Sequence, residues 1–248
     1  MLVIDRGEDW LAIGQPAHAW LSGQIARAWG NERFTRPEPF EEVCLGVEQH
    51  DVAWIDWDVR PPLHAPARRA ASFLEVPFEP RLGRWAAAPE RVLAASPYAA
   101  LLVSLHGRNI HTRFGDPDAL PAPQAAAVHA YLDGQAALQD RLIADLGITR
   151  EEAERGGDLL FCLDVLSLAI CHGWPARELP AVDGVAIAAA PAGAAEYALD
   201  PWPLGVGELV VGLRARRLAE RFDDEAALHR ALDAAPWTPM RWTLRPAG

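Results

Sequence analysis

Apolar side chains recur at the three- and four-residue spacing of amphipathic helices between residues 16 and 173. Such patterns begin at Pro16, about Phe40, Ser96-Pro97, about Pro123 and Thr149. Ser96 and Thr149 have side chains that cap helix N-termini, and Glu152, three residues after Thr149, completes a capping box. Residues 16–173 are therefore predicted to form a helical core.

The two ends of the chain follow a different pattern. Residues 2–5 and 10–13 are short apolar runs typical of strands, separated by a turn. Residues 174–248 alternate strand-like runs with Gly and Pro turns, except for helical spacing over 223–234. We expect one domain over 1–248 that is mostly α. Its helical core spans about 16–173, and its β-rich appendage, a small antiparallel sheet, takes in about 1–15 plus 174–248.

Residues 56–90 do not follow either pattern. They are rich in Pro, Arg and Trp, and we expect a mostly irregular excursion with one or two short helices. A loop of this length in a compact domain is often a lid or a substrate-binding segment. A packed surface excursion without a catalytic role is the alternative.

Two acids interrupt the apolar helical stripes. Asp51 continues the stripe of Val43 and Val47, and Asp164 is the only acid in the apolar run 159–171. A buried carboxylate that is unpaired costs several kcal/mol, so these positions indicate a partner. The partner is either an arginine or a cation bound for function, since functional sites are where a charged side chain most often interrupts an otherwise apolar helix face.

Two histidines are placed to join these acids. His18 points to the buried face near the start of the first helix, and His50 precedes Asp51 directly. With Asp164 they provide two imidazoles and two carboxylates, a set that suits Mn²⁺, Fe²⁺, Mg²⁺ or Zn²⁺ and leaves positions for water and substrate. A divalent metal acidifies bound water and holds phosphate oxygens, so hydrolysis of a phosphate ester is the natural reaction class. In the alternative interpretation, His18 is simply a hydrogen-bonded core histidine.

Five further residues are weaker candidates. His106 and His111 lie at and just beyond the end of the helix that begins at Ser96, beside Arg108 and Arg113. The arginines could hold a substrate phosphate or be a solvated helix end. Glu48, one turn before Asp51, is a candidate for proton transfer.

Composition limits the class of partner. The net charge of −11 argues against a nucleic-acid binder, which needs a basic surface. No run of the sequence resembles a signal peptide or is long enough to span a bilayer, and the three cysteines show no CxxC pair. We therefore expect a cytoplasmic protein without a membrane partner, acting on a small phosphorylated molecule. The oligomeric state stays open.

The order His18, His50-Asp51, Asp164 resembles the signature of the HD-domain metal-dependent phosphohydrolases. The resemblance implies an HD-like helical bundle in which these four residues bind a metal, and water activated by it attacks phosphorus. Some members hold a second metal with two extra histidines, a role open to His106 and His111. The interval between Asp51 and Asp164 is long for the superfamily, and the insertion at 56–90 can account for it.

The stretches 15–23, 48–54, 104–106 and 163–168 are also similar to a bacterial family catalogued only as a domain of unknown function. The sequence thus predicts a metal-dependent hydrolase with three groups of site residues. The metal ligands are His18, His50, Asp51 and Asp164; the catalytic residues are Asp51, His106 and Glu48; the substrate-binding residues are Arg108, Arg113 and His111. The alternative is a non-catalytic metal- or ligand-binding protein on the same scaffold. A di-iron oxygenase is disfavoured because no ExxH pair is present.

Overall fold

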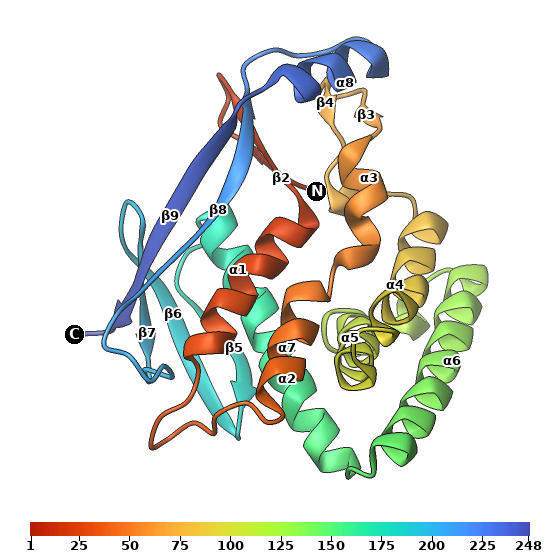
Figure 1. The fold of residues 1–248 in the computed structure, drawn as a ribbon. Helices are drawn as coiled ribbons and strands as arrows, with labels where there is room; N and C mark the ends of the chain where they lie inside the picture. Colours follow the sequence, from red (N-terminus) through yellow and green to blue (C-terminus); the bar gives the residue numbers. More distant parts are fainter.

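Helices occupy one side of the molecule and a long curled sheet the other (Figure 1). The computed structural model describes residues 1–248. The α-helices are α1 (Gln15–Ala28), α2 (Phe40–Gln49), α3 (Ile55–Val59), α4 (Phe78–Leu93), α5 (Pro97–Asn109), α6 (Ala122–Leu146), α7 (Arg150–His172) and α8 (Glu225–Ala234). Single-turn elements are the 3₁₀ helices η1 (Val52–Trp54), η2 (Phe73–Glu75) and η4 (Pro117–Ala119), and the π-helix η3 (Ile110–Phe114).

The predicted helix starts and stops coincide with the local chemistry. Ser96 Oγ accepts the Ala99 N–H at 3.1 Å, and Thr149 forms the predicted capping box with Glu152 at the start of α7. Gly147 and Gly173 end α6 and α7 in the left-handed conformation, which glycine adopts without steric cost. The positions of the long helices in the core are therefore determined by short-range signals.

The main core lies between α1, α2, α5 and α7, and continues under the sheet. It contains 37 buried residues, among them the fully buried Leu101, Leu102, Leu105, Leu160 and Leu163. Each leucine buried in this way stabilises the fold by roughly 1.5–3 kcal/mol relative to an exposed one. These four helices are consequently held at fixed positions, and each carries a candidate site residue.

Seven strands form one mixed sheet in the order β1-β2-β8-β9-β7-β6-β5. Its strands are β1 (Leu2–Asp5), β2 (Trp10–Ile13), β5 (Arg177–Val182), β6 (Val185–Gly193), β7 (Glu196–Asp200), β8 (Leu209–Leu218) and β9 (Trp237–Pro246). β2 pairs with β8, so the N-terminal hairpin joins the C-terminal strands, and β7 and β9 are parallel while the other pairs are antiparallel. A separate hairpin is formed by β3 (Leu63–His64) and β4 (Arg69–Ala70).

The predicted fold class was wrong. About half of the chain, 52%, is helical, and the sheet is large, curled and mixed, so the protein is not a mostly α bundle with a small antiparallel sheet. The error came from strand length: β8 and β9 are ten residues each and pair continuously from Leu209–Leu244 to Arg216–Trp237. Each strand provides backbone hydrogen-bond partners for the other over this whole length. The local alternation of apolar and polar residues in the sequence does not reveal such long-range pairing.

Residues 56–90 are also more regular than predicted. Thirteen of these 35 residues belong to α4, a helix of 16 residues that packs against α5. Pro80 lies in its first turn, where the missing N–H costs nothing, and Pro89 lies inside the helix. Trp85 of α4 is 9% exposed and packs with Trp54 and Tyr131, which explains why the segment is ordered.

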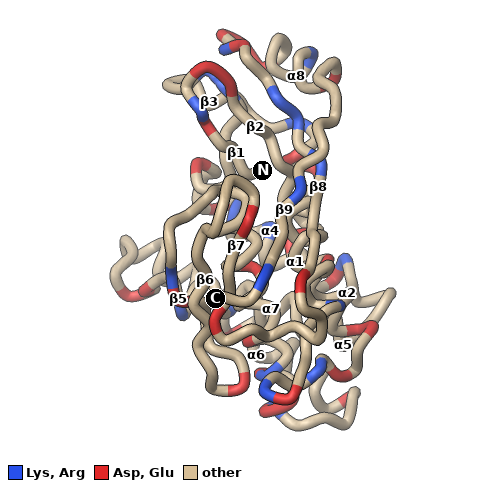
Figure 2. Tube along the Cα trace, turned by 90° about the vertical axis from the view of Figure 1, so that its left-hand side faces the viewer, with Lys and Arg blue, Asp and Glu red and all other residues tan.

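Charged positions are interspersed over the surface (Figure 2). Several form ion pairs between distant segments, such as Arg60 with Asp233 at 3.0 Å and Arg221 with Asp5 at 2.8 Å. Exposed pairs of this kind contribute roughly 0–1 kcal/mol each, so the apolar core dominates stability. None of the helices has the length and apolar character that a bilayer crossing requires.

Candidate metal centre

Four helices bring five polar side chains to one buried place. His18 lies in the first turns of α1, His50 caps the end of α2 with Asp51 next to it, His106 lies near the end of α5, and Asp164 is central in α7. All five are between 1% and 5% exposed. They form two groups of potential metal ligands, His18-His50-Asp51 and His50-His106-Asp164, with ligand atoms within 4.8 Å in each.

The orientation of His50 follows from the end of α2. Its Nδ1 donates to the carbonyl oxygen of Val47 at 2.8 Å, one of the carbonyls that a helix C-terminus leaves without a partner. In the neutral ring the proton therefore sits on Nδ1, and the lone pair of Nε2 faces the centre. This is the arrangement usual for a histidine that binds a metal.

His18 is oriented by Ser167, which the sequence analysis did not identify. Ser167 Oγ lies 2.9 Å from the carbonyl oxygen of Asp164 and 2.9 Å from Nδ1 of His18. A carbonyl only accepts, so the single hydroxyl proton of Ser167 is donated to it. His18 Nδ1 then donates to Ser167, so Nε2 is the nitrogen left to bind a cation; in the structure it is hydrogen-bonded to Asp51 Oδ2 at 2.7 Å. In the sequence, Ser167 could have been identified from its position one helical turn after Asp164.

The two carboxylates face these nitrogens. Asp51 Oδ2 is 2.7 Å from His18 Nε2, and Asp164 Oδ1 is 3.4 Å from His50 Nε2. A lone pair opposite a carboxylate is repulsive unless a proton or a cation lies between them. When no cation is bound, His50 is protonated instead. Burial opposes this protonation, but the charges of Asp51 and Asp164 outweigh burial and raise the pKa of His50 to about 9.

The same charges act on the acids. Burial favours the neutral form of Asp51, but His50 and His18 outweigh burial and lower its pKa. The pKa of Asp164 is lowered in the same way by its histidine neighbours, against the effect of burial. Both carboxylates therefore stay ionised, and the centre attracts positive charge.

Two nitrogens in the centre are unsatisfied. Nε2 of His50 and Nδ1 of His106 are fully buried and make no hydrogen bond. Burial, together with the charge of His50, lowers the pKa of His106 to about 4, so its ring is neutral at pH 7. Unpaired buried nitrogens are costly, and a cation would satisfy them. The buried His and Asp groups can thus hold a metal ion.

Three predicted residues are engaged elsewhere. Glu48 is paired with Arg27 and packs over Gly23. Arg108 donates to both carboxylate oxygens of Glu154, and Arg113 pairs with Asp158 while its guanidinium lies 5.2 Å from the Phe161 ring centre. The structure does not bring these three side chains into either ligand group.

His111 lies in an aromatic cluster. It is on the π-helix η3, between Trp85 and Tyr131, with ring centres at 4.8 and 5.1 Å. Its Nε2 and the Tyr131 hydroxyl are buried without partners. Burial is the main cause that lowers the His111 pKa to about 4. His111 and His106 therefore belong to different clusters, as the break after α5 permits.

A buried centre of histidines and aspartates on four packed helices defines a candidate metal-binding protein. The chain belongs to the family described as "Protein of unknown function (DUF3891)", whose model matches residues 1–220. The match includes all five residues of the centre and ends before α8 and β9. No curated protein and no solved structure matches the chain.

Proposed function

We propose that the protein is a metal-dependent hydrolase of a phosphate ester, with a small molecule or nucleotide as substrate. One observation carries the proposal: the Nε2 atoms of His18 and His50, whose Nδ1 atoms are engaged elsewhere, face two buried carboxylates, Asp51 and Asp164. The order of these residues along the chain supports an HD-like site. A divalent metal supplies such a site with acidified water and a hold on phosphate oxygens.

The residues divide into holding and proton-handling roles. His18, His50, Asp51 and Asp164 hold the metal, and Asp51, the most exposed of the four at 5%, has an ionised carboxylate that can orient the attacking water by accepting a hydrogen bond from it. His106 is neutral and has an unpaired Nδ1, so it can accept a proton or hold a substrate oxygen. It is also placed to complete the second ligand group.

The arginines near α5 have a conditional role. Arg108 and Arg113 are held by Glu154 and Asp158, and each carboxylate occupies donors that a phosphate would use. Substrate phosphate would replace these carboxylates, with His111 beside them in the aromatic cluster. Glu48 would have to leave Arg27 in order to transfer a proton.

Metal content tests the centre directly. Purified wild-type protein should contain a divalent transition metal by elemental analysis, and Asp51→Asn and His50→Gln should lose most of it. His129→Gln is a matched control, because His129 is exposed on α6 and pairs only with Asp118. With Mn²⁺ added, wild-type protein should hydrolyse at least one member of a phosphoester and nucleotide panel, and Asp51→Asn none. Equal, negligible metal in wild type and variants would refute the metal centre.

A second candidate, a protein that binds a metal without turnover, is favoured by the burial of the site. All five residues are at most 5% exposed, so a substrate would have to displace part of the surrounding structure. Metal-loaded protein that turns over no phosphoester at any metal tested would favour this candidate.

A further inference from the structure

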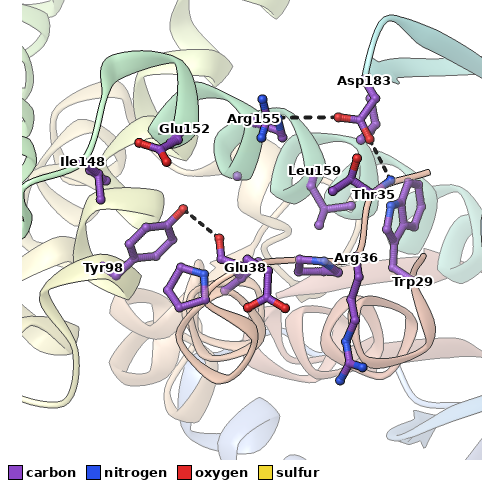
Figure 3. A pocket seen from close by; sticks show the side chains of 15 residues that line it. Trp29, Thr35, Arg36, Glu38, Tyr98, Ile148, Glu152, Arg155, Leu159 and Asp183 are labelled. Atoms are coloured by element: carbon purple, nitrogen blue, oxygen red, sulfur yellow. Dashed lines mark hydrogen bonds and ion pairs between the residues drawn. The ribbon is translucent and has the colours of Figure 1, made fainter. Parts of the chain in front are cut away.

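Figure 3 shows a cavity with an apolar floor and a charged rim, lined by residues from the end of α1 and the first turns of α2 and α5. Its volume is about 320 Å³. Trp29 at the end of α1, Val43 of α2, Tyr98 of α5 and Leu159 of α7 contribute to its lining. Tyr98 is two helical turns from His106 on α5, which at 1.5 Å per residue separates the two sites by roughly 12 Å. The cavity is therefore distinct from the metal centre.

One wall is a loop held in place by hydrogen bonds. The Asn31 side chain accepts the backbone N–H groups of Arg33 and Phe34 at 2.9 and 3.1 Å and donates to the Trp202 carbonyl at 2.9 Å. Further along, the Thr35 N–H donates to Asp183 in the β5–β6 turn at 3.0 Å. The loop is anchored on both sides, so the wall is a built feature of the fold.

The floor of the cavity is apolar and contains one unsatisfied donor. Val43, Leu159 and Trp29 are between 1% and 4% exposed, and the indole N–H of Trp29 makes no hydrogen bond. Gly156 belongs to the same surface, where a Cβ would come within 2.8 Å of Leu102 Cδ2. The missing side chain therefore lets α5 and α7 pack closely beneath the floor, and the Trp29 N–H is enclosed by the same packing.

The rim carries charges of both signs. Arg155, with Asp183 at 3.7 Å, lies on one side of the cavity, and Glu38 lies on the opposite side (Figure 3). The carboxylate of Glu38 forms no ion pair or hydrogen bond, whereas the guanidinium of Arg36 lies over the Phe40 ring at 4.3 Å. An incoming cation thus finds a free acid on one side, and an incoming anion finds Arg155, which also lies 3.8 Å from Glu151, on the other.

We propose that this cavity binds a small zwitterion with an apolar side chain, of the size and charge pattern of an apolar α-amino acid. The ligand carboxylate is received by Arg155. Its ammonium group is received by Glu38, and its side chain lies on Val43 and Leu159. The proposal uses no residue of the metal centre and stands or falls independently of the proposed hydrolase.

Calorimetric titration and thermal shift with three probes test the ligand class. L-Phenylalanine should bind and raise the melting temperature. 2-Phenylethylamine lacks the carboxylate and 3-phenylpropionate lacks the ammonium group, so each should bind at least about tenfold more weakly, the loss of one charge-assisted interaction. Absence of binding by both L-phenylalanine and L-leucine would overturn the site, and equal binding of either analogue would overturn the zwitterion.

Rim variants locate the binding. Arg155→Gln and Glu38→Gln are both at exposed positions and thus compatible with folding. Each should weaken the binding of L-phenylalanine by roughly tenfold or more. Arg141→Gln, at an exposed site on α6, is the matched control and should bind like the wild type. Wild-type affinity in Arg155→Gln would refute the assignment. Metal content should be unchanged in all three, which separates this result from a failure of the metal centre.

Discussion

Ser167 is the residue whose replacement tests the logic of the metal centre most sharply. Its hydroxyl donates to the Asp164 carbonyl and accepts from His18 Nδ1, which keeps the lone pair of His18 on Nε2. Ser167→Ala removes only this hydroxyl and leaves every metal-ligand candidate in place. The variant should fold, because the helix gains a residue of higher helical propensity at a small change of volume.

The expected loss follows from what the hydroxyl does. In Ser167→Ala, Nδ1 of His18 has no acceptor, so the Nε2–H tautomer becomes competitive, with its proton directed at Asp51 Oδ2, 2.7 Å away. Metal must then displace that proton. Removing the outer hydrogen-bond partner of a ligating histidine typically costs 10–100-fold in metal affinity, which corresponds to about 1.4–2.7 kcal/mol.

Competition of Zn²⁺ or Mn²⁺ between the protein and a fluorescent chelator measures this affinity. Ser22→Ala is the matched control, since Ser22 is a fully buried helical serine whose hydroxyl contacts only the carbonyls of His18 and Leu163. If Ser167→Ala and Ser22→Ala bind metal equally well, the tautomer argument is wrong.

Two further predictions concern the aromatic cluster beside the centre. A Cβ at Gly107 would lie 2.1 Å from the Tyr131 hydroxyl, so Gly107→Ala should lower the free energy of unfolding in urea by about 1–3 kcal/mol. Adding Tyr131→Phe should recover part of that loss, and strict additivity of the two changes would contradict the contact. His111 has a pKa of about 4 in the folded protein against 6.5 for the free side chain, so protonation favours unfolding. Stability should be complete above about pH 6.5 and fall toward pH 4, and His111→Phe should reduce that fall by about 1–2 kcal/mol, less than the full shift because the ring is partly exposed. An unchanged pH profile in denaturant titrations of His111→Phe would contradict this assignment.

The helices of the core were predictable because their signals are short-range. The Ser96 cap, the capping box of Thr149 and the stop at Gly147 all act within a few residues and recur in the structure. The two acids on apolar stripes were visible for the same reason. A buried charge needs a partner wherever it lies, and both Asp51 and Asp164 are buried beside histidines.

Features that depend on distant partners were missed. The length of β8 and β9 depends on their pairing with each other, and the parallel contact of β7 with β9 joins segments that are separated by α8. The order of α4 depends on Trp85 packing with Trp54 and Tyr131. Arg108 and Arg113 were predicted to bind a substrate phosphate, but they form ion pairs with Glu154 and Asp158 of α7, two acids far along the chain.

By itself, the sequence determined the helical core, its caps and the need of Asp51 and Asp164 for a partner, either a cation or an arginine. Only the tertiary structure decided what surrounds these acids. It placed Nδ1 of His50 against the Val47 carbonyl and Nδ1 of His18 against Ser167, so that both rings direct Nε2 to the centre, and it left a nitrogen of His106 unpaired nearby. The physical reason is that burial cost is a property of a single residue, whereas a hydrogen-bond direction exists only when the partner's position is given.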